Sequence, residues 1–186
     1  MLTDLNIDKS YLGGNLFIKS RIRTLEIIQA GDREWNTCNC TIALQPYSGI
    51  YRWYVRIKNF TERRGHCMLG VATTDFSYDE FLGQHQESWG LSPNLDLFHG
   101  GRKRRTESER KLTVGSTVEI TLDTYKGTLY FAEILAESPS GGHLIEPLGF
   151  DNLEGVVVYP AFSLYSPGDC FSIITNADDI KSMKLR

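Results

Sequence analysis

The sequence predicts an all-β fold, arranged as an antiparallel sandwich or barrel. Short segments of alternating apolar and polar residues dominate the chain; in one of them Tyr51, Trp53, Val55 and Ile57 share a face. A period of two with aromatic and β-branched residues is typical of a half-buried strand. Glycines and prolines separate these segments, and no stretch of ten or more residues carries a helical stripe.

The predicted strands follow one another along almost the whole chain. In order they are Leu16–Ile18, Leu25–Ile28, Cys40–Leu44, Tyr51–Ile57, Leu69–Thr73, Ser88–Leu91, Thr117–Leu122, Leu129–Phe131, Val156–Tyr159, Ala161–Leu164 and Phe171–Thr175. Asp123–Gly127 places an Asp and a Gly between two of them, which predicts a hairpin. Helical structure is expected at most at Ala177–Leu185 and as a turn near Asp4–Tyr11, and Glu137–Leu144 is expected to form a surface loop.

The composition is that of one globular domain over residues 1–186. Apolar residues make up 41% of the chain and charged residues 23%, so a disordered chain is not expected. The net charge of −3 argues against a protein whose main task is to hold nucleic acid. The start of the chain, MLTDLNIDKS, does not resemble a secretory signal, and no apolar run approaches the ~20 residues that span a bilayer. We therefore expect a cytoplasmic protein without membrane association.

The residues give no positive reason to predict an enzyme, a metal site or a cofactor. Cys38 and Cys40 are separated by one residue, whereas zinc ligands favour wider gaps, so reduced and mostly buried thiols are expected. Glu119 and Asp123 would lie about 13 Å apart along one strand, too far for a glycosidase pair. Glu119 is expected to face solvent, Asp123 to bond its own turn, and His99 to serve in a turn or in packing.

Two other binding roles stay open. A sugar-binding sandwich would need an exposed tryptophan platform at Trp35 or Trp89. A nucleic-acid contact or a nuclear localisation signal would use the basic segment 102–111, and above all Arg102, Lys103, Arg104 and Arg105. Glu107 and Glu109 cancel part of that charge, and the run lacks the interleaved aromatics that stack bases. An exposed hairpin loop is the favoured interpretation, and nucleic acid is not expected as the main partner.

Five sequence blocks follow one another in order over about 120 residues of the chain. They are Ser48–Ile57 (SGIYRWYVRI), Leu69–Thr73 (LGVAT), Ser88–Leu91 (SWGL) with His99–Gly101 (HGG), Val118–Asp123 (VEITLD) with Gly127–Phe131 (GTLYF), and Tyr159–Tyr165 (YPAFSLY). In this order the blocks resemble the SPRY domain of the B30.2 family. The resemblance is strong because the blocks occur together on a chain already predicted to be all-β.

The resemblance implies two packed antiparallel sheets, no catalysis, and recognition of a short peptide or protein surface by loops at one end. Within the family, the motifs are most similar to the SPRY substrate receptors that carry a SOCS box. The resemblance then implies a partner-binding set made of Tyr78, Gln84, His85, Leu164, Tyr165 and Ser166. The Arg-Pro loop that completes the pocket in that branch is not found at Thr37–Ile42 (TCNCTI), so the peptide preference of the branch is not carried over. Trp89 is expected in the core.

Overall fold

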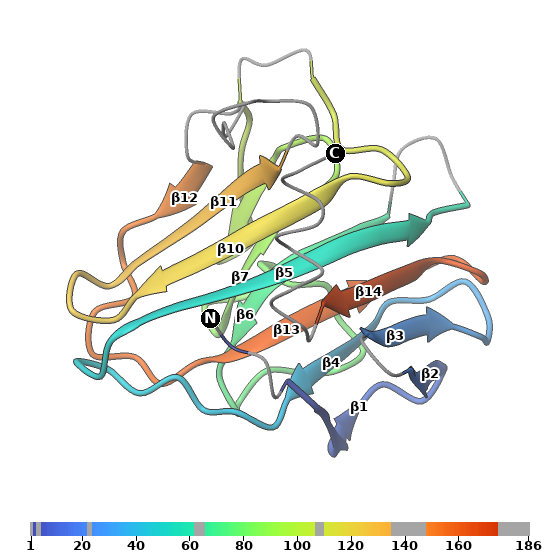
Figure 1. The fold of residues 1–186 in the computed structure, drawn as a ribbon, viewed down its shortest axis with the longest axis horizontal. Helices are drawn as coiled ribbons and strands as arrows, with labels where there is room; N and C mark the ends of the chain where they lie inside the picture. The colour runs from blue at the N-terminus through green and yellow to red at the C-terminus, as the bar shows by residue number, and fades with distance from the viewer. Residues whose placement is uncertain are drawn as a thin grey trace.

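The predicted β-sandwich is confirmed. The computed structural model describes residues 2, 5–21, 24–61, 66–106, 110–134 and 148–174. These residues form two antiparallel sheets of seven strands each, which pack face to face (Figure 1). In the part of the chain that is described, no helix is long and apolar enough to cross a bilayer.

The first sheet, called sheet A, contains the strands that carry the site described below. Its order is β1 (Ile7–Leu12), β4 (Asn36–Cys40), β13 (Tyr159–Leu164), β6 (Cys67–Ala72), β7 (Ser88–Leu91), β8 (Leu97–His99) and β9 (Arg102–Arg104). Sheet B has the order β12 (Leu148–Phe150), β11 (Thr128–Ile134), β10 (Thr117–Asp123), β5 (Ile50–Asn59), β14 (Cys170–Ile174), β3 (Thr24–Gln29) and β2 (Leu16–Ser20).

The core lies between the two sheets and is built from alternate residues of each strand. Trp53, Phe131, Phe162 and Phe171 are its largest fully buried side chains. The rings of Phe162 and Phe171 join sheet A to sheet B with their centroids 6.2 Å apart. Because side chains of a strand alternate between faces, the residues next to these inward-facing ones lie on the outer faces of the sheets.

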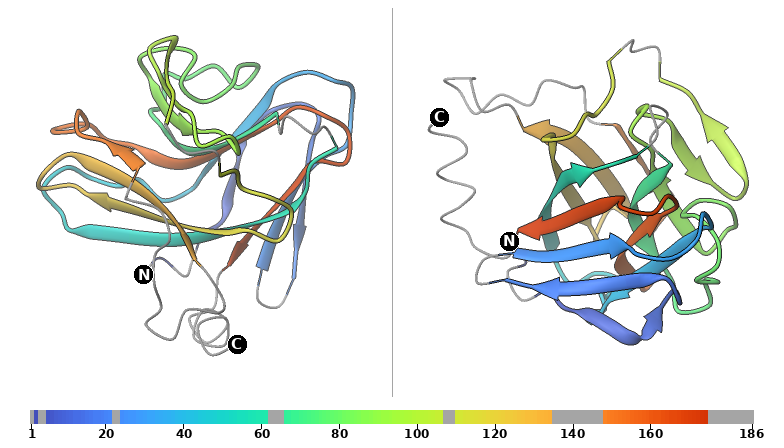
Figure 2. Two further views of the ribbon diagram at one scale, coloured as in Figure 1. Left: turned by 90° about the horizontal axis from the view of Figure 1, so that it is seen from above. Right: turned by 90° about the vertical axis from the view of Figure 1, so that its right-hand side faces the viewer.

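The segment between β6 and β7 lies on the outer face of sheet A. Figure 2 shows this part of the chain, in green, on the side of sheet A that faces away from sheet B. A second small hydrophobic cluster fills the space beneath it, with Met68, Phe76, Leu82 and Ala161 buried there. The outer face of sheet A is therefore covered in part by a loop rather than left open to solvent.

The turn prediction at Asp123 is confirmed. β10 pairs with β11 up to Asp123 and Thr128, and the Asp123 carboxylate accepts hydrogen bonds from the backbone N–H groups of Tyr125 and Lys126 at 3.0 and 3.1 Å. Gly127 closes the turn with a φ of 62°, a conformation that favours glycine. Asp123 and Gly127 thus have the structural roles in this turn that their residue types predict.

Two sequence predictions about exposure and helicity are wrong. Glu119 does not face solvent: it is 6% exposed, and its carboxylate lies 3.3 Å from the Arg52 guanidinium on the neighbouring strand. The helical turn expected near Asp4–Tyr11 is replaced, in the described part of that segment, by strand β1, whose backbone pairs with β4 between Ile7 and Cys40. In both places a neighbouring strand, which is distant in sequence, supplies the contact that decides the conformation.

The strand boundaries differ from the prediction in a few places. A strand was predicted at Cys40–Leu44, but β4 already ends at Cys40. In place of the predicted strands at residues 41–44 and 156–158, the structure has one isolated bridge between Leu44 and Val158. The short strands β8, β9 and β12 were not predicted. The helix expected at Ala177–Leu185 and the loop expected at Glu137–Leu144 lie outside the described residues.

Candidate functional site

Three aromatic side chains meet at one end of sheet A. Asn36 of β4, Leu164 of β13 and Cys67 of β6 are in register across the sheet. The next residue outward on each strand is Trp35, Tyr165 or His66, and the Trp35 ring lies 5.2 Å from Tyr165 and 6.3 Å from His66. Leu164 and Cys67 are fully buried in the core, so the three rings, one position further, project from the opposite face.

A short hydrogen-bond chain holds the segment between β6 and β7, residues 73–87, onto this face; we call this segment the covering loop. Thr37 Oγ1 donates to the carbonyl of Glu80 at 2.6 Å, and Ser163 Oγ lies 2.6 Å from Thr37 Oγ1. Ser163 Oγ also accepts the backbone N–H of Leu82 at 3.0 Å. Because the single Thr37 proton goes to Glu80, Ser163 donates to Thr37 and accepts from Leu82. The sheet thereby fixes the loop on both sides of Phe81.

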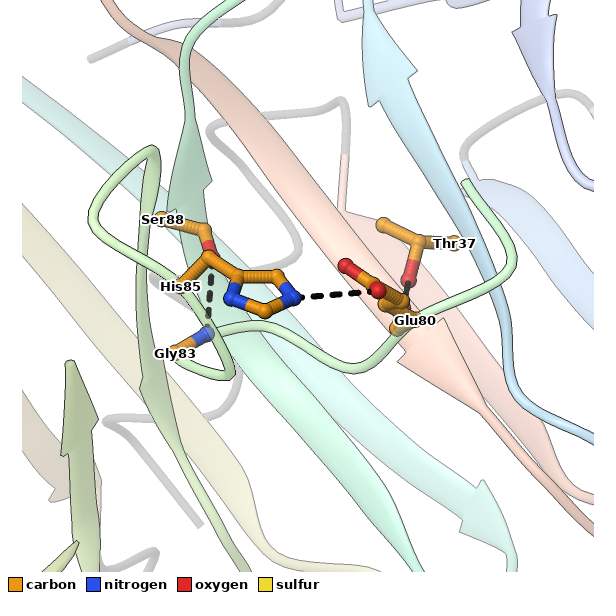
Figure 3. Close-up of polar contacts among 5 residues, drawn as sticks. All are labelled: Thr37, Glu80, Gly83, His85 and Ser88. Carbon is orange, nitrogen blue, oxygen red and sulfur yellow. Dashed lines mark hydrogen bonds and ion pairs between the residues drawn. The ribbon is translucent and has the colours of Figure 1, made fainter. Parts of the chain in front are cut away.

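The far side of the loop is fixed by a serine and a glycine. The backbone N–H of Gly83 donates to Ser88 Oγ at 2.7 Å (Figure 3). Gly83 has a φ of 92°, and a Cβ at this position would overlap the carbonyl of Phe98. The loop can approach β8 this closely only with glycine at residue 83.

Together these elements form what we call the aromatic pocket, a cavity of about 230 Å³ on the outer face of sheet A. Phe81 packs against Trp35 at 5.2 Å and edge-on against Phe98 at 5.7 Å. The residues that line the pocket are Trp35, His66, Met68, Phe81, Ser92, Asn94, Asp96, Phe98 and Lys103. One wall is therefore aromatic and apolar, and the other is polar.

The polar wall is built by the turn between β7 and β8 and by β9. Leu95 takes a φ of 62°, which is strained for a residue with a branched side chain, and it is buried while its neighbours reach the pocket. The Asp96 carboxylate lies 2.5 Å from Lys103 Nζ. That ammonium also sits 5.6 Å from the centroid of the Phe98 ring, within range of a cation–π interaction. The pocket thus contains one internally neutralised ion pair.

The structure places the predicted residues Gln84 and His85 at the edge of the covering loop. His85 Nε2 points toward the Glu80 carboxylate and lies 3.0 Å from it (Figure 3). The His85 side chain is 54% exposed. The His85 carbonyl accepts the N–H of Gly100 in the turn between β8 and β9. Gln84 is half-buried beside the same turn. Both residues are accessible, and both lie next to the loop segment that carries Phe81.

Tyr78 and Tyr165 belong to different aromatic groups, although the resemblance places them in one pocket. The Tyr78 ring packs against Tyr11 at 5.3 Å and Phe76 at 6.2 Å, whereas Tyr165 packs against Trp35 and His66. Among the described residues, the buried Tyr78 hydroxyl has no hydrogen-bond partner, and burial raises the pKa of Tyr78. Tyr78 therefore anchors the covering loop near β1, while Tyr165 supports the wall of the aromatic pocket.

Leu164 and Ser166 cannot contact a partner in this structure. Both side chains are fully buried, Leu164 in the core between the sheets. The backbone N–H of Ser166 donates to Asp169, which holds the turn after β13. The alternation of β13 explains the correction: the residue between them, Tyr165, is the one that projects from the outer face.

Trp35, His66, Phe81 and Phe98 were not predicted as parts of one site. The sequence offers Trp35 as a sugar platform and His66, beside Cys67, as a metal ligand that the ligand spacing disfavours; it gives no signal at Phe81 or Phe98. These four residues lie 15 or more positions apart in sequence. Strand pairing brings Trp35 and His66 to one edge of sheet A, while Phe81 comes from the covering loop and Phe98 from β8. The one available signal is that Trp35, His66 and Tyr165 each flank the end of a strand, which identifies a shared edge only once the pairing is known.

The remaining chemistry candidates are accounted for by packing. Trp89 is 3% exposed, as predicted; its indole N–H donates to Asn152 at 3.0 Å, and its ring stacks on His99 at 4.7 Å. The thiols of Cys38 and Cys170 are buried, and burial raises their pKa, to about 11 for Cys170. Among the described residues, no group of three or more His, Cys, Asp or Glu side chains could hold a metal ion.

Comparison with protein families identifies the fold family. The sequence profile of the SPRY domain matches residues 50–178. The chain belongs to the SPRY domain family. The matched range contains most of the strands that form the aromatic pocket, whereas Trp35 lies before it.

The curated relatives of this SPRY domain are much longer proteins. The E3 ubiquitin-protein ligase TRIM9 of Drosophila melanogaster is 29% identical over 118 residues, which cover 62% of this chain and 15% of TRIM9. SPRY domain-containing SOCS box protein 3 of Xenopus tropicalis is 37% identical over 71 residues, which cover 34% of this chain and 19% of that protein. The chain thus spans less than a fifth of the length of either relative.

Solved structures support the same fold. The SPRY domain of human HERC1 superposes with a TM-score of 0.66 at 20% identity, over 91% of this chain and 97% of that one. The PSpry domain of TRIM65 gives a TM-score of 0.67 at 19% identity, over 92% of each chain. At these identities the likeness establishes the sandwich and leaves the binding residues to be argued from this chain itself.

Proposed function

We propose that this SPRY domain is a non-catalytic protein-interaction module that binds a short peptide or a protein loop through the aromatic pocket. The observation that carries the proposal is the rigid aromatic wall of Trp35, Phe81 and Phe98, held in place from both sides by hydrogen bonds of the covering loop. Rigid aromatic side chains in a preorganised recess give contact area at a low entropic cost and dominate binding energy at protein interfaces.

The size of the pocket favours a single side chain as the occupant. Its volume of about 230 Å³ is smaller than the ~300–1,000 Å³ of sites that enclose a drug-sized ligand. A peptide or loop that inserts one large side chain, while its backbone lies across the rim, suits this volume. The accessible residues Gln84 and His85 on the covering loop extend the surface on which the rest of the segment would lie.

Two observations weigh against the alternatives of sugar binding and catalysis. Trp89 is buried and Trp35 forms a wall of a recess, so neither offers the flat exposed ring that a sugar platform needs. The acidic residue at the pocket, Asp96, is neutralised by Lys103 and has no second carboxylate among the residues that line the cavity.

We further propose that the module serves to select the target of a larger cytoplasmic or nuclear protein. The support is the naming of its relatives: TRIM9 is an E3 ubiquitin-protein ligase, and the other is a SOCS box protein with a SPRY domain. In such an arrangement the aromatic pocket would recruit the protein on which the rest of the chain acts.

The proposal is tested by quantitative capture of proteins from cell lysate with matched variants. Phe81→Ala and Tyr165→Ala are expected to lose the same partner, by roughly 30-fold in affinity if each truncation removes about 2 kcal/mol. Tyr125→Ala is the control, because Tyr125 is a well-exposed tyrosine in the turn between β10 and β11 of sheet B and does not line the pocket. Melting temperatures are measured for all variants, so that loss of folding is recognised.

Retention of every partner by both pocket variants would refute the proposal. Tyr78→Ala forms a separate arm, because its ring belongs to the group with Tyr11 and Phe76. A partner lost only in Tyr78→Ala would move the binding surface from the aromatic pocket to that second group.

A further inference from the structure

A cluster of exposed cations adjoins the aromatic pocket. β9 pairs with β8 through a tight turn in which Gly100 and Gly101 have φ values of 58° and 70°. All three residues of β9, and Arg105 after it, are exposed. We call this cluster the basic ridge; its members are Arg102, Lys103, Arg104 and Arg105. Lys103 is itself part of the pocket lining, so the ridge begins at the pocket wall.

Only part of the positive charge of the ridge is neutralised by other residues of the domain. Lys103 is neutralised by Asp96, and the Arg104 guanidinium donates to the carbonyl of Gly149, which carries no net charge. Arg102 and Arg105 form no ion pair with any other residue that the structure describes. Residues 102–111 contain six Lys or Arg and, with Glu107 and Glu109, two acids, so this segment keeps an excess of positive charge on a chain whose net charge is −3.

The covering loop on the other side of the pocket has the opposite character. Residues 73–87 contain four carboxylates and neither Lys nor Arg. The acids are Asp75, Asp79, Glu80 and Glu87, and Glu80 is the neighbour of the pocket residue Phe81. A polyanion such as nucleic acid, laid across this face, would meet like charge at the loop as soon as it left the ridge. A peptide can instead confine its acidic residues to the few positions that face the ridge.

We propose that the segment bound by this domain carries acidic residues within about two to four positions of the apolar side chain that enters the aromatic pocket. This inference rests on the proposed function. The spacing follows from the strand rise of ~3.3 Å per residue, since Arg105 lies two residues, or about 7 Å, beyond Lys103 at the pocket wall. Complementary charge of this kind accelerates association and selects among partners that share an apolar anchor.

The physical reason for acidic selection is the geometry of the guanidinium group. Exposed Arg side chains bind carboxylates through paired N–H donors, and each such pair contributes modestly in water. Arg102 pairs with His99 on one face of the hairpin, whereas Lys103 pairs with Phe98 on the pocket face. The ridge thus offers cations on both faces of an edge strand, which an extended acidic segment can approach from the side.

Fluorescence anisotropy with synthetic peptide pools tests the inference. Three fluorescein-labelled heptapeptide pools have Leu, Met, Phe and Trp mixed at the central position and are otherwise all Glu, all Gln or all Lys. The wild-type domain is expected to bind the Glu pool tightest. The double variant Arg102→Gln/Arg105→Gln is expected to bind it roughly 3–10-fold more weakly, with little change toward the Gln pool. Lys19→Gln/Lys126→Gln removes the same charge from exposed positions outside the site and serves as the control.

The outcomes separate the inference from the proposed function. If all three pools bind equally and Phe81→Ala abolishes this binding, the proposed function stands and acidic selection is refuted. If no pool binds the wild type, the proposed function fails and the inference falls with it. A labelled dodeca-uridylate that binds more tightly than the Glu pool, and is lost in the Arg102→Gln/Arg105→Gln variant, would assign the ridge to nucleic acid and overturn the inference.

Discussion

Removing the Ser163 hydroxyl is expected to loosen the covering loop and destabilise the domain. Ser163 is fully buried and takes part in two hydrogen bonds, to Thr37 Oγ1 at 2.6 Å and from the Leu82 N–H at 3.0 Å. In Ser163→Ala the Leu82 N–H stays buried without an acceptor and Thr37 loses a donor. An unsatisfied buried donor costs about 1–3 kcal/mol, so we expect the free energy of unfolding to fall by about 2–3 kcal/mol in total.

Urea unfolding followed by circular dichroism measures this difference. Thermal unfolding followed by the same signal gives the melting temperature. For a domain of this size, 1 kcal/mol corresponds to a shift in melting temperature of roughly 2–4 °C, so the melting temperature is expected to fall by about 4–12 °C. Ser172→Ala is the matched control, because Ser172 is a buried strand serine of sheet B without a side-chain hydrogen bond among the described residues. We expect that control to stay within about 0.5 kcal/mol of the wild type.

A double-mutant cycle shows whether the loop is held as one unit. Thr37→Ala and Ser163→Ala remove neighbouring members of the same chain of hydrogen bonds, so their effects are expected to be non-additive by about 0.5–3 kcal/mol. Peptide binding at the aromatic pocket should weaken in Ser163→Ala as well, since Leu82 adjoins Phe81. The reasoning is refuted if Ser163→Ala is as stable as Ser172→Ala and the two sites act independently.

Two further predictions concern a glycine and a tyrosine. Gly83→Ala should lower the free energy of unfolding, measured in urea, by about 2 kcal/mol more than Gly115→Ala. Both glycines have a φ above 90°, but only at residue 83 does a backbone carbonyl, that of Phe98, occupy the place of a Cβ. Equal losses in the two variants would show that the close contact with Phe98 is unimportant. Burial, and then the hydrogen bond to Glu119, raises the pKa of Tyr54 above its ordinary value of 10. The unfolded chain therefore releases this proton first, and the folding stability is expected to fall as the pH rises above 10, less steeply in Tyr54→Phe; equal slopes between pH 9 and 10.5 in the two proteins would contradict this.

The sandwich could be predicted from local patterns, because strands of this type leave a record in adjacent residues. The alternation in Ile50–Asn59 comes from one face meeting the core, where Trp53 and Val55 are fully buried. The turn at Asp123–Gly127 could be predicted because its Asp bonds backbone N–H groups two and three residues ahead and its Gly adopts a positive φ, and all these residues lie within four positions. The core position of Trp89 could be predicted on the same basis, from the small residues on either side of it.

The aromatic pocket could not be predicted in this way, because pairing between distant strands creates it. Trp35, His66 and Tyr165 come together only when β4, β13 and β6 align their ends. The same alignment buries Leu164 and Ser166. Family resemblance placed Tyr165 in one pocket with Tyr78, whereas in the structure Tyr165 packs against Trp35 and His66. Tyr78, on the covering loop, packs instead against Tyr11 of β1.

Exposure was the property for which local reasoning was least informative. Glu119 occupies an outward position of β10, which a period of two predicts to be wet, yet Arg52 and Tyr54 of β5 surround it. Alternation along a strand determines which face a side chain occupies, and it carries no information about what covers that face. The residue order of this chain was therefore sufficient to specify strands, turns and an apolar interior, whereas strand register and the loop laid over sheet A decided which side chains line the aromatic pocket.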